Sequence, residues 1–258
     1  MIAAGIDVGT ETTKVVILNN NEIASWHLLA GGDENAALSG EKALSEAAQK
    51  AGIKLADIQK LAATGLPDIQ FSFVNEQVPE AMCIAKGIEW LLPSTRTVLD
   101  LGAGKSLAVK CNQGKPLKIA RNDKCASGTG KYLDIVGKIL GIGHDEMAEL
   151  FFQSKESVEI QSTCAVFVES EVISLLHVKS RPEDIARGAL RGLVKRIYPL
   201  LIEVGLEREV ALVGGLARNK GVVAAFEELM GHELIVPPEP QIVAALGAAL
   251  ITREKAAA

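Results

Sequence analysis

The stretch IDVGTETTKVVI, residues 6–17, has the form of two β-strands joined by a tight glycine turn. Its β-branched and apolar residues lie on both sides of the turn, a spacing that favours a hairpin over a helix. The chain repeats this form in LDLGAGKSLAVK, residues 99–110, where an apolar residue again precedes Asp-x-Gly. An internal repeat of this kind predicts two lobes built from the same unit.

The segment PSTRT, residues 93–97, is the expected boundary between these lobes. The N-terminal lobe would cover residues 1–95 with the first turn, and the C-terminal lobe residues 96–258 with the second. Helices are predicted at 40–52, 79–93, 129–141, 145–154, 164–177, 182–204, 218–230 and 240–253, and further strands at 60–66, 209–215 and 232–237. Strands interleaved with helices predict an α/β protein with a mixed β-sheet in each lobe, flanked by helices.

The overall composition narrows the class of protein. The chain has 258 residues, 48% of them hydrophobic, and a formal net charge of -5. A negative net charge argues against nucleic acid or an anionic membrane as the main partner. The longest apolar run, IVAALGAALI, is too short to span a bilayer, and the N-terminus has no basic region of a signal peptide. We therefore expect a cytoplasmic protein, in which structural disulfides are uncommon.

The segment GAGKS, residues 102–106, is similar to the end of a P-loop. Leu99 occupies the place of the first glycine of that motif, and the residues that follow continue as a strand instead of opening a helix. We therefore reject a P-loop.

The two Asp-x-Gly turns offer a different phosphate site. Their backbone N–H groups can bind phosphate oxygens, glycine allows close approach, and each Asp can hold Mg²⁺ through water. This chemistry makes Asp7 and Asp100 the candidate catalytic residues. Gly9 and Gly102 are candidate nucleotide ligands.

Two more glycine segments follow along the chain. The pair Gly214 and Gly215, in LVGGLARN, is predicted to let an adenosine lie on the backbone, and Gly247, in ALGAAL, to form another close-packed turn. This ordered set resembles the sugar kinase/heat-shock protein 70/actin superfamily over nearly the whole chain. The resemblance implies a two-lobed actin-like ATPase fold with ATP or ADP between the lobes, and it places Thr10 and Lys14 near the first phosphate turn.

Two cysteine segments restrict the resemblance to one group of ATPases within this superfamily. NDKCASGTGKYLD, residues 122–134, and STCAVFVESEVI, residues 162–173, look like segments of the activator ATPases of 2-hydroxyacyl-CoA dehydratases and the ATPase subunits of benzoyl-CoA reductases. That resemblance implies an iron–sulfur ATPase that couples ATP hydrolysis to low-potential electron transfer. Glu169 and Glu171 are interpreted either as polar partners near the nucleotide or as a solvated helix face.

The thiols of Cys125 and Cys164 fit such a cofactor. A [4Fe–4S] cluster usually takes four thiolates, so two chains with two thiolates each would share one cluster on a two-fold axis. Each cysteine precedes a predicted helix, whose N-terminus favours an anionic ligand. Zinc is disfavoured because the chain has no C-x₂-C pair and no histidine close to either cysteine. We assign Cys83 and Cys111 to packing.

The second turn departs from the family it resembles. Activators typically carry D-x-G-G-Q-D there, but in DLGAGK the expected Gln is Gly104 and the expected Asp is Lys105. Lys105 can bind phosphate as a point charge. The missing side chains would orient the attacking water or the Mg²⁺ shell, so the rate at which this chain alone hydrolyses ATP is in question. The departure is similar to one of the two unlike ATPase subunits of benzoyl-CoA reductases, which implies a heterodimer as an alternative to a homodimer.

The resemblance as a whole implies an ATP-dependent electron donor. A ferredoxin or flavodoxin would reduce the shared cluster, which would pass an electron to the iron–sulfur component of an acyl-CoA dehydratase or reductase. Two alternatives stay open: a small-molecule kinase of the same superfamily, and an actin-like nucleotide-binding scaffold without a cluster.

Overall fold

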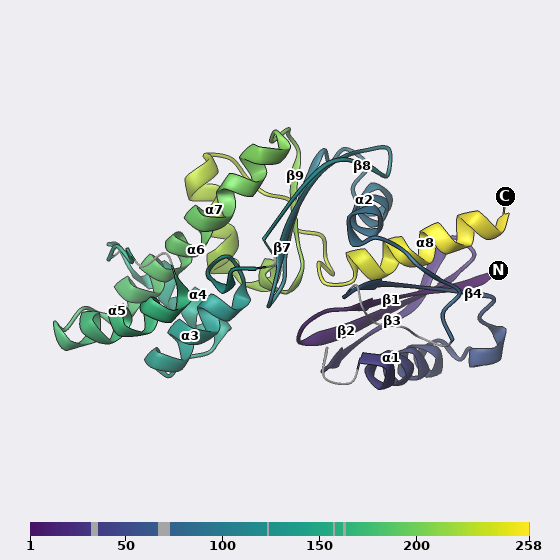
Figure 1. Cartoon of the computed structure of the whole chain (residues 1–258), viewed down its shortest axis with the longest axis horizontal. Coiled ribbons are helices and arrows are strands. Elements are labelled where there is room, and N and C mark those ends of the chain that lie inside the picture. The colour runs from purple at the N-terminus through teal and green to yellow at the C-terminus, as the bar shows by residue number, and fades with distance from the viewer. Residues whose placement is uncertain (32–35, 67–72, 123, 157, 162–163, 258) are drawn as a thin grey trace. The chain divides into compact units, whose positions relative to one another are not determined.

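The computed structural model describes residues 1–31, 36–66, 73–122, 124–156, 158–161 and 164–257 (Figure 1). The chain divides into two compact units. The first comprises Met1–Val98, Val109–Ile119 and Pro237–Ala258, and the second comprises Leu99–Ala108 and Ala120–Val236. The lobe boundary at residues 95 and 96 stays a prediction.

The first unit contains a sheet with the strand order β3-β2-β1-β4-β5. The strands are β1 (Ile2–Val8), β2 (Thr12–Asn19), β3 (Glu22–Ala30), β4 (Lys60–Gly65) and β5 (Glu76–Gln77). β1 pairs antiparallel with β2, with Asp7 opposite Lys14, and parallel with β4, with Asp7 opposite Thr64. The mixed sheet that the sequence predicted is therefore confirmed, and its first hairpin lies at 2–19.

Helices cover both faces of this sheet, as Figure 1 shows. Val15 and Ile17 of β2 pack with α1 (Ala36–Ala51). Their neighbours Val16 and Leu18 face the other way, toward α8 (Val243–Ala257). Side chains alternate between the faces of a strand, so one apolar run supplies both cores.

Three glycines allow α8 to lie unusually close to its neighbours. A Cβ on Gly5 of β1 would lie 2.0 Å from the carbonyl oxygen of Ala245. On Gly87 of α2 (Glu80–Leu91) it would lie 2.1 Å from the oxygen of Val243. A Cβ on Gly247 would lie 1.7 Å from the oxygen of Cys83 on α2. Backbone therefore packs directly on backbone here, and any larger residue would force the elements apart.

A second sheet has the strand order β8-β7-β6-β9. Its strands are β6 (Thr97–Leu101), β7 (Ser106–Asn112), β8 (Lys115–Asn122) and β9 (Val210–Val213). β6, β7 and β8 each contribute residues to both compact units.

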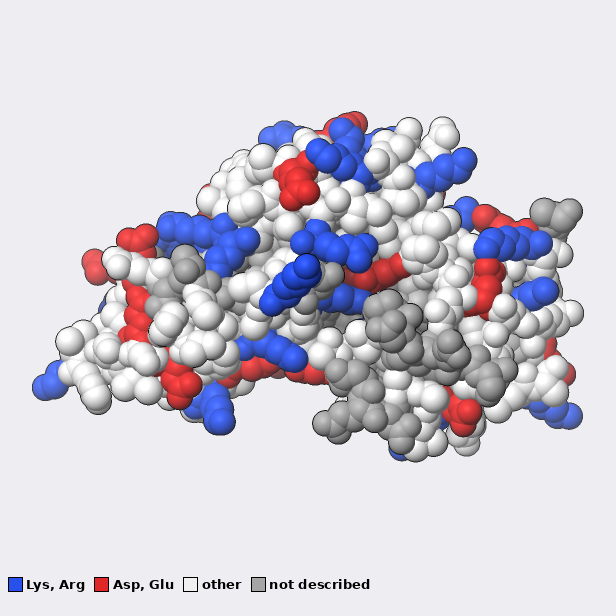
Figure 2. All heavy atoms as spheres, in the orientation of Figure 1, with Lys and Arg blue, Asp and Glu red and all other residues white. Residues whose placement is uncertain are grey.

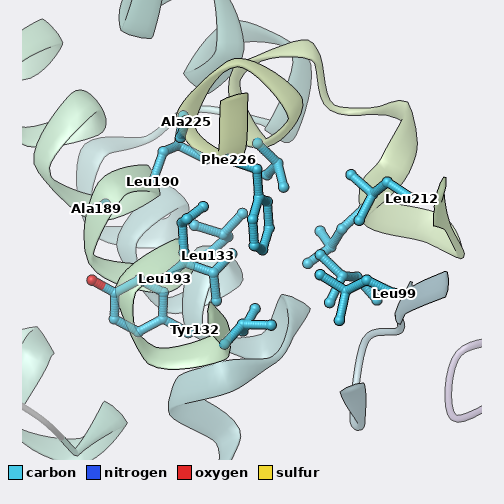
Figure 3. Packing of buried hydrophobic residues seen from close by; sticks show 14 of the residues in the cluster. Leu99, Tyr132, Leu133, Ala189, Leu190, Leu193, Leu212, Ala225 and Phe226 are labelled. Atoms are coloured by element: carbon cyan, nitrogen blue, oxygen red, sulfur yellow. The ribbon is translucent and has the colours of Figure 1, made fainter. Parts of the chain in front are cut away.

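The second unit is mainly helical, as predicted for the chain after residue 125. Its helices are α3 (Gly130–Leu140), α4 (His144–Gln153), α5 (Ala165–His177), α6 (Pro182–Val204) and α7 (Lys220–Met230). Figure 3 shows Phe226 of α7 among Leu133, Leu190 and Leu193, facing Leu99 and Leu212 of the strands. The core is aliphatic with few aromatic rings, in line with an aromatic content of only 4%.

One predicted element is wrong. Residues 232–237 form no strand, because Ile235 makes only a single bridge to Ala211. The strands β3, β5 and β8 had not been predicted. Among the helices of the described residues, none combines the length and the apolar character that crossing a membrane requires.

Candidate functional site

The first Asp-x-Gly turn holds a buried ion pair. Asp7 is only 6% exposed, and the Nζ of Lys14 lies 3.2 Å from its Oδ2. The other oxygen, Oδ1, has no hydrogen-bond partner among the described residues. A buried carboxylate oxygen without a partner costs free energy in the isolated chain, which suits a position that binds a hydrated cation.

Gly9 makes room for that pair. Its N–H donates to the carbonyl oxygen of Thr12 at 2.9 Å, which closes the hairpin turn. A Cβ on Gly9 would lie 2.9 Å from the Nζ of Lys14. Thr10 lies next in the turn and is half-buried.

Gly65 is a site residue that the sequence did not single out. It ends β4 with φ at +102°, and a Cβ there would lie 2.7 Å from Oδ1 of Asp7 and 2.1 Å from the oxygen of Val8. The signal available was a glycine at the end of the predicted strand 60–66, which is too common to identify a contact across the sheet.

The second turn repeats the arrangement in the second unit. Gly102 donates its N–H to the carbonyl oxygen of Lys105 at 2.9 Å. Gly214, which follows β9, has φ at +86°, and a Cβ there would lie 2.2 Å from Oδ1 of Asp100. Gly215 comes next and is exposed, so its backbone is open to solvent. The structure therefore brings Asp100, Gly102, Lys105 and Gly214 together.

Gly247 has a different setting, in the interior of α8 against the backbone of Cys83. This contact alone explains why the position is glycine. Its assignment to the nucleotide stays a prediction.

Cys125 lies on a segment that is bonded to the second turn. Asn122 clamps the cysteine: its Oδ1 accepts from the N–H of Cys125 at 3.1 Å, and its Nδ2 donates to the carbonyl oxygen at 2.9 Å. At the start of α3, Gly130 donates its N–H to the oxygen of Gly102 at 3.0 Å. Lys131 likewise donates to the oxygen of Ala103 at 3.0 Å. These two hydrogen bonds connect the second turn with the start of α3, which follows Cys125 closely in the chain.

Cys164 occupies the N-cap position of α5, as predicted from sequence. Its carbonyl oxygen accepts from the N–H of Phe167 at 3.1 Å and of Val168 at 3.3 Å. Cys125 is exposed and Cys164 is half-buried, so both thiols are accessible. Glu171 accepts a hydrogen bond from the N–H of Gln161 at 2.7 Å, whereas Glu169 is exposed.

The other two cysteines are buried, as expected for packing residues. Burial raises the pKa of Cys83 to about 12 and the pKa of Cys111 to about 11. Buried, protonated thiols of this kind are typical of packing residues. Across the described ranges, no group of three or more His, Cys, Asp and Glu side chains is placed to hold a metal ion.

The model of one protein family matches residues 4–252, and its description is the BadF/BadG/BcrA/BcrD ATPase family. The chain is 38% identical over 258 residues to the 2-hydroxyisocaproyl-CoA dehydratase activator of Clostridioides difficile, covering 99% of this chain and 96% of that protein. It is 36% identical over 255 residues to the (R)-2-hydroxyglutaryl-CoA dehydratase activating ATPase of Acidaminococcus fermentans, covering 98% and 97%. It is 29% identical over 262 residues to one of the subunits of the benzoyl-CoA reductase of Thauera aromatica, covering 96% and 92%.

The solved structures similar to this chain include activators of the same kind as its sequence relatives. The activator of the 2-hydroxyisocaproyl-CoA dehydratase from Clostridium difficile with bound ADPNP superposes with a TM-score of 0.93 at 37% identity, covering 100% of this chain and 96% of that one. A ROK family glucokinase from Streptomyces griseus, in complex with glucose and AMPPNP, has a TM-score of 0.60 at 13% identity, covering 98% and 100%, which supports the shared fold alone. The predicted actin-like α/β fold is confirmed.

Proposed function

Because the chain belongs to the BadF/BadG/BcrA/BcrD ATPase family, we propose that it is an ATP-dependent electron donor that activates an acyl-CoA dehydratase or a benzoyl-CoA reductase. The observation that carries the proposal is the similar setting of Cys125 and Cys164. Both thiols are accessible, both precede a helical segment, and the two remaining cysteines are buried with raised pKa values.

A [4Fe–4S] cluster fits these two thiols when a second chain supplies two more. Cys125 and Cys164 are the residues that would hold it, and when bound it would supply a one-electron centre of low potential.

The exposed face of α5 supports pairing of two chains. In the first turn of α5 after Cys164, Val166 is 74% exposed and Phe167 is 66% exposed, and Ile173 is exposed two turns further on. Large apolar side chains gathered on one helix face favour burial against a partner. A homodimer, or a heterodimer with a related ATPase subunit, would bury this face and bring four thiols together.

In this proposal Asp7 in the first unit and Asp100 in the second are each candidates to bind hydrated Mg²⁺, and the glycine turn that follows each aspartate is a candidate to bind phosphate. The free Oδ1 of Asp7 fits the hydrogen bonds of a Mg²⁺-bound water. Lys14, held at 3.2 Å from Asp7, and Lys105, whose carbonyl oxygen closes the second turn, place positive charge beside the phosphates. These residues orient the nucleotide and neutralise its charge, the main tasks in phosphoryl transfer.

The hydrogen bonds from Gly130 and Lys131 to the second turn connect nucleotide binding with Cys125. A change in the position of Gly102 or Ala103 would displace the start of α3, and with it the cysteine segment. ATP binding and hydrolysis would thereby alter how the thiol is held. The protein would act in the cytoplasm, with a ferredoxin or flavodoxin as reductant.

Anaerobic purification tests the proposal. The wild-type protein should carry about four iron and four sulfide ions per pair of chains, and the Cys125→Ser and Cys164→Ser variants should lose most of both. The Cys111→Ala variant, which changes a buried cysteine, is the matched control and should keep its iron. Wild-type protein without iron, or equal iron in all variants, would exclude the redox role.

A further inference from the structure

The second unit contains a cavity of about 600 Å³ between α6 and the segment 158–161. α6 contributes Gly188, Arg191, Gly192, Lys195 and Arg196 to its wall. The volume lies in the range of pockets that bind small organic molecules. No part of the function proposed above uses this cavity.

The wall formed by residues 158–161 is held in place at both ends. A Cβ on Gly188 would lie 2.2 Å from the carbonyl oxygen of Val158, so the segment lies directly on the helix backbone. At the other end, the N–H of Gln161 donates to Oε1 of Glu171 on α5 at 2.7 Å. These contacts hold residues 158–161 against α6 and α5, so the wall of the cavity has a fixed position.

Arg196 is pre-positioned at the cavity wall. Its guanidinium lies over the ring of Tyr132, 4.8 Å from the ring centroid. Gly192 makes this possible, because a Cβ there would lie 2.7 Å from Nη1 of Arg196 and 3.2 Å from the Tyr132 oxygen. In Figure 3 the hydroxyl of Tyr132 points away from the other labelled core residues. Burial raises the pKa of Tyr132, and the Arg196 charge opposes that rise only in part, so the phenol keeps its proton.

Basic side chains outnumber carboxylates at the cavity, in a chain whose net charge is -5. Arg191, Lys195 and Arg196 line the cavity together with the carboxylate of Glu159, and a second carboxylate, that of Glu171, lies beside the lining residue Gln161 and adds to the effect of burial in raising the pKa of Tyr132. The Glu159 oxygen lies 3.8 Å from Nζ of Lys195, and both side chains are more than half exposed, so this pair contributes little and a stronger anion can displace it. Figure 2 shows a group of Lys and Arg side chains over α6.

We propose that this cavity binds an organic phosphate of about nucleotide size. Two guanidinium groups and an ammonium group suit the several oxygens of a phosphate or pyrophosphate group. Val158 and Ile160 supply an apolar wall for the rest of the molecule. The site lies within the second unit and requires neither iron nor the Asp-x-Gly turns.

Calorimetric titration of the whole protein with inorganic pyrophosphate tests the site. Arg191→Gln and Lys195→Gln should each weaken one binding event by about tenfold or more, because each removes a charge-assisted hydrogen bond. The matched control is Lys138→Gln, which neutralises an exposed lysine on α3, and its affinity should equal that of the wild-type protein. Gly192→Ala should weaken the same event, because the new methyl group displaces the flexible end of Arg196 without meeting backbone.

Competition experiments identify the source of the phosphate. ADP and coenzyme A are titrated against bound pyrophosphate, in the wild-type protein and in Lys195→Gln. If ADP or coenzyme A competes with pyrophosphate in the wild-type protein but not in Lys195→Gln, the proposal is supported and the competing compound is identified as the ligand. The proposal is overturned if the two α6 variants bind pyrophosphate like the wild-type protein, if Lys138→Gln weakens it equally, or if neither organic phosphate competes.

Discussion

Gly214 and Asp100 come so close that a Cβ on the glycine would lie 2.2 Å from Oδ1 of the aspartate. In the first unit Gly65 stands in the same relation to Asp7, at 2.7 Å. Both glycines have positive φ, and each ends or follows a strand that is the neighbour of the aspartate's strand. The internal repeat therefore extends beyond the Asp-x-Gly turns to a second glycine on the neighbouring strand.

Gly214→Ala should lower the free energy of unfolding by about 2–4 kcal/mol and weaken ATP binding. Alanine at positive φ costs about 1 kcal/mol, and the methyl group must also displace the Asp100 carboxylate or the backbone of Leu101. Urea unfolding and equilibrium ATP titration are the measurements. The control is Gly205→Ala, which also has positive φ but meets no atom within 4 Å, and it should cost only about 1 kcal/mol. Equal losses in both variants would contradict the role of the close contact.

Lys14→Met should destabilise the protein by about 2–4 kcal/mol, because it leaves the buried Asp7 carboxylate without its cation. Chemical denaturation measures the loss, and added Mg²⁺–ATP should restore more stability to the wild-type protein than to the variant. Lys86→Met breaks the more exposed pair with Glu254 and should cost less than about 1 kcal/mol. A loss as small for Lys14→Met would mean that the pair is not effectively buried.

Gly247→Ala distinguishes a packing role from a nucleotide role. Since its Cβ would lie 1.7 Å from the oxygen of Cys83, we expect a loss of about 2–3 kcal/mol in thermal or urea unfolding. Gly143→Ala, where a Cβ meets nothing within 4 Å, should change stability by less than about 1 kcal/mol. If Gly247→Ala instead leaves stability unchanged and lowers ATP affinity alone, the nucleotide role predicted from sequence is the better explanation.

Stability should fall as the pH rises above about 9, the ordinary pKa of a cysteine. Burial raises the pKa of Cys83 to about 12 and that of Cys111 to about 11, so between these values the unfolded chain releases protons that the folded chain keeps. The contribution is fully present below pH 9 and is lost by up to about 1.4 kcal/mol per pH unit for each thiol. Urea unfolding from pH 8 to pH 10.5 measures the slope. Cys111→Ala should make it shallower, and an unchanged slope would show that this thiol is not responsible.

Asn122→Ala should loosen the segment of Cys125 because it removes both hydrogen bonds that hold the cysteine backbone. In anaerobically prepared protein, iron should be lost to a chelator about thirtyfold faster than from the wild-type protein, if each of the two bonds contributes about 1 kcal/mol. Asn112→Ala, at the exposed end of β7, is the control and should retain iron normally. Equal rates of loss would mean that the clamp does not support the ligand.

Much of the fold followed from local patterns. The two hairpins around Asp7 and Asp100 were predictable because a short strand, an Asp-x-Gly turn and a second strand are compatible with few structures other than a hairpin. α6 and the other long helices were predictable from apolar spacing and from Pro or Gly at their ends. The thiols of Cys125 and Cys164 were assigned through resemblance more than through spacing.

Contacts between distant parts of the chain were not predictable. Gly65 and Gly5 look like ordinary strand glycines until β4 and α8 are placed beside β1. The segment 232–237 has strand-like residues, but only Ile235 reaches the sheet. In each case a partner far along the sequence decides the outcome, and local propensity carries no information about that partner.

The packing of α8 on β1 has a consequence for synthesis on the ribosome. β1 leaves the ribosome long before α8, so the face it presents to Ala245 stays uncovered until residues 243–257 have been made. At 5–20 residues per second this delay lasts roughly 10 to 50 seconds, long enough for a chaperone to bind the nascent sheet. The first unit would therefore complete its folding only after the second unit has been made. A messenger RNA truncated before α8 would yield an aggregation-prone product.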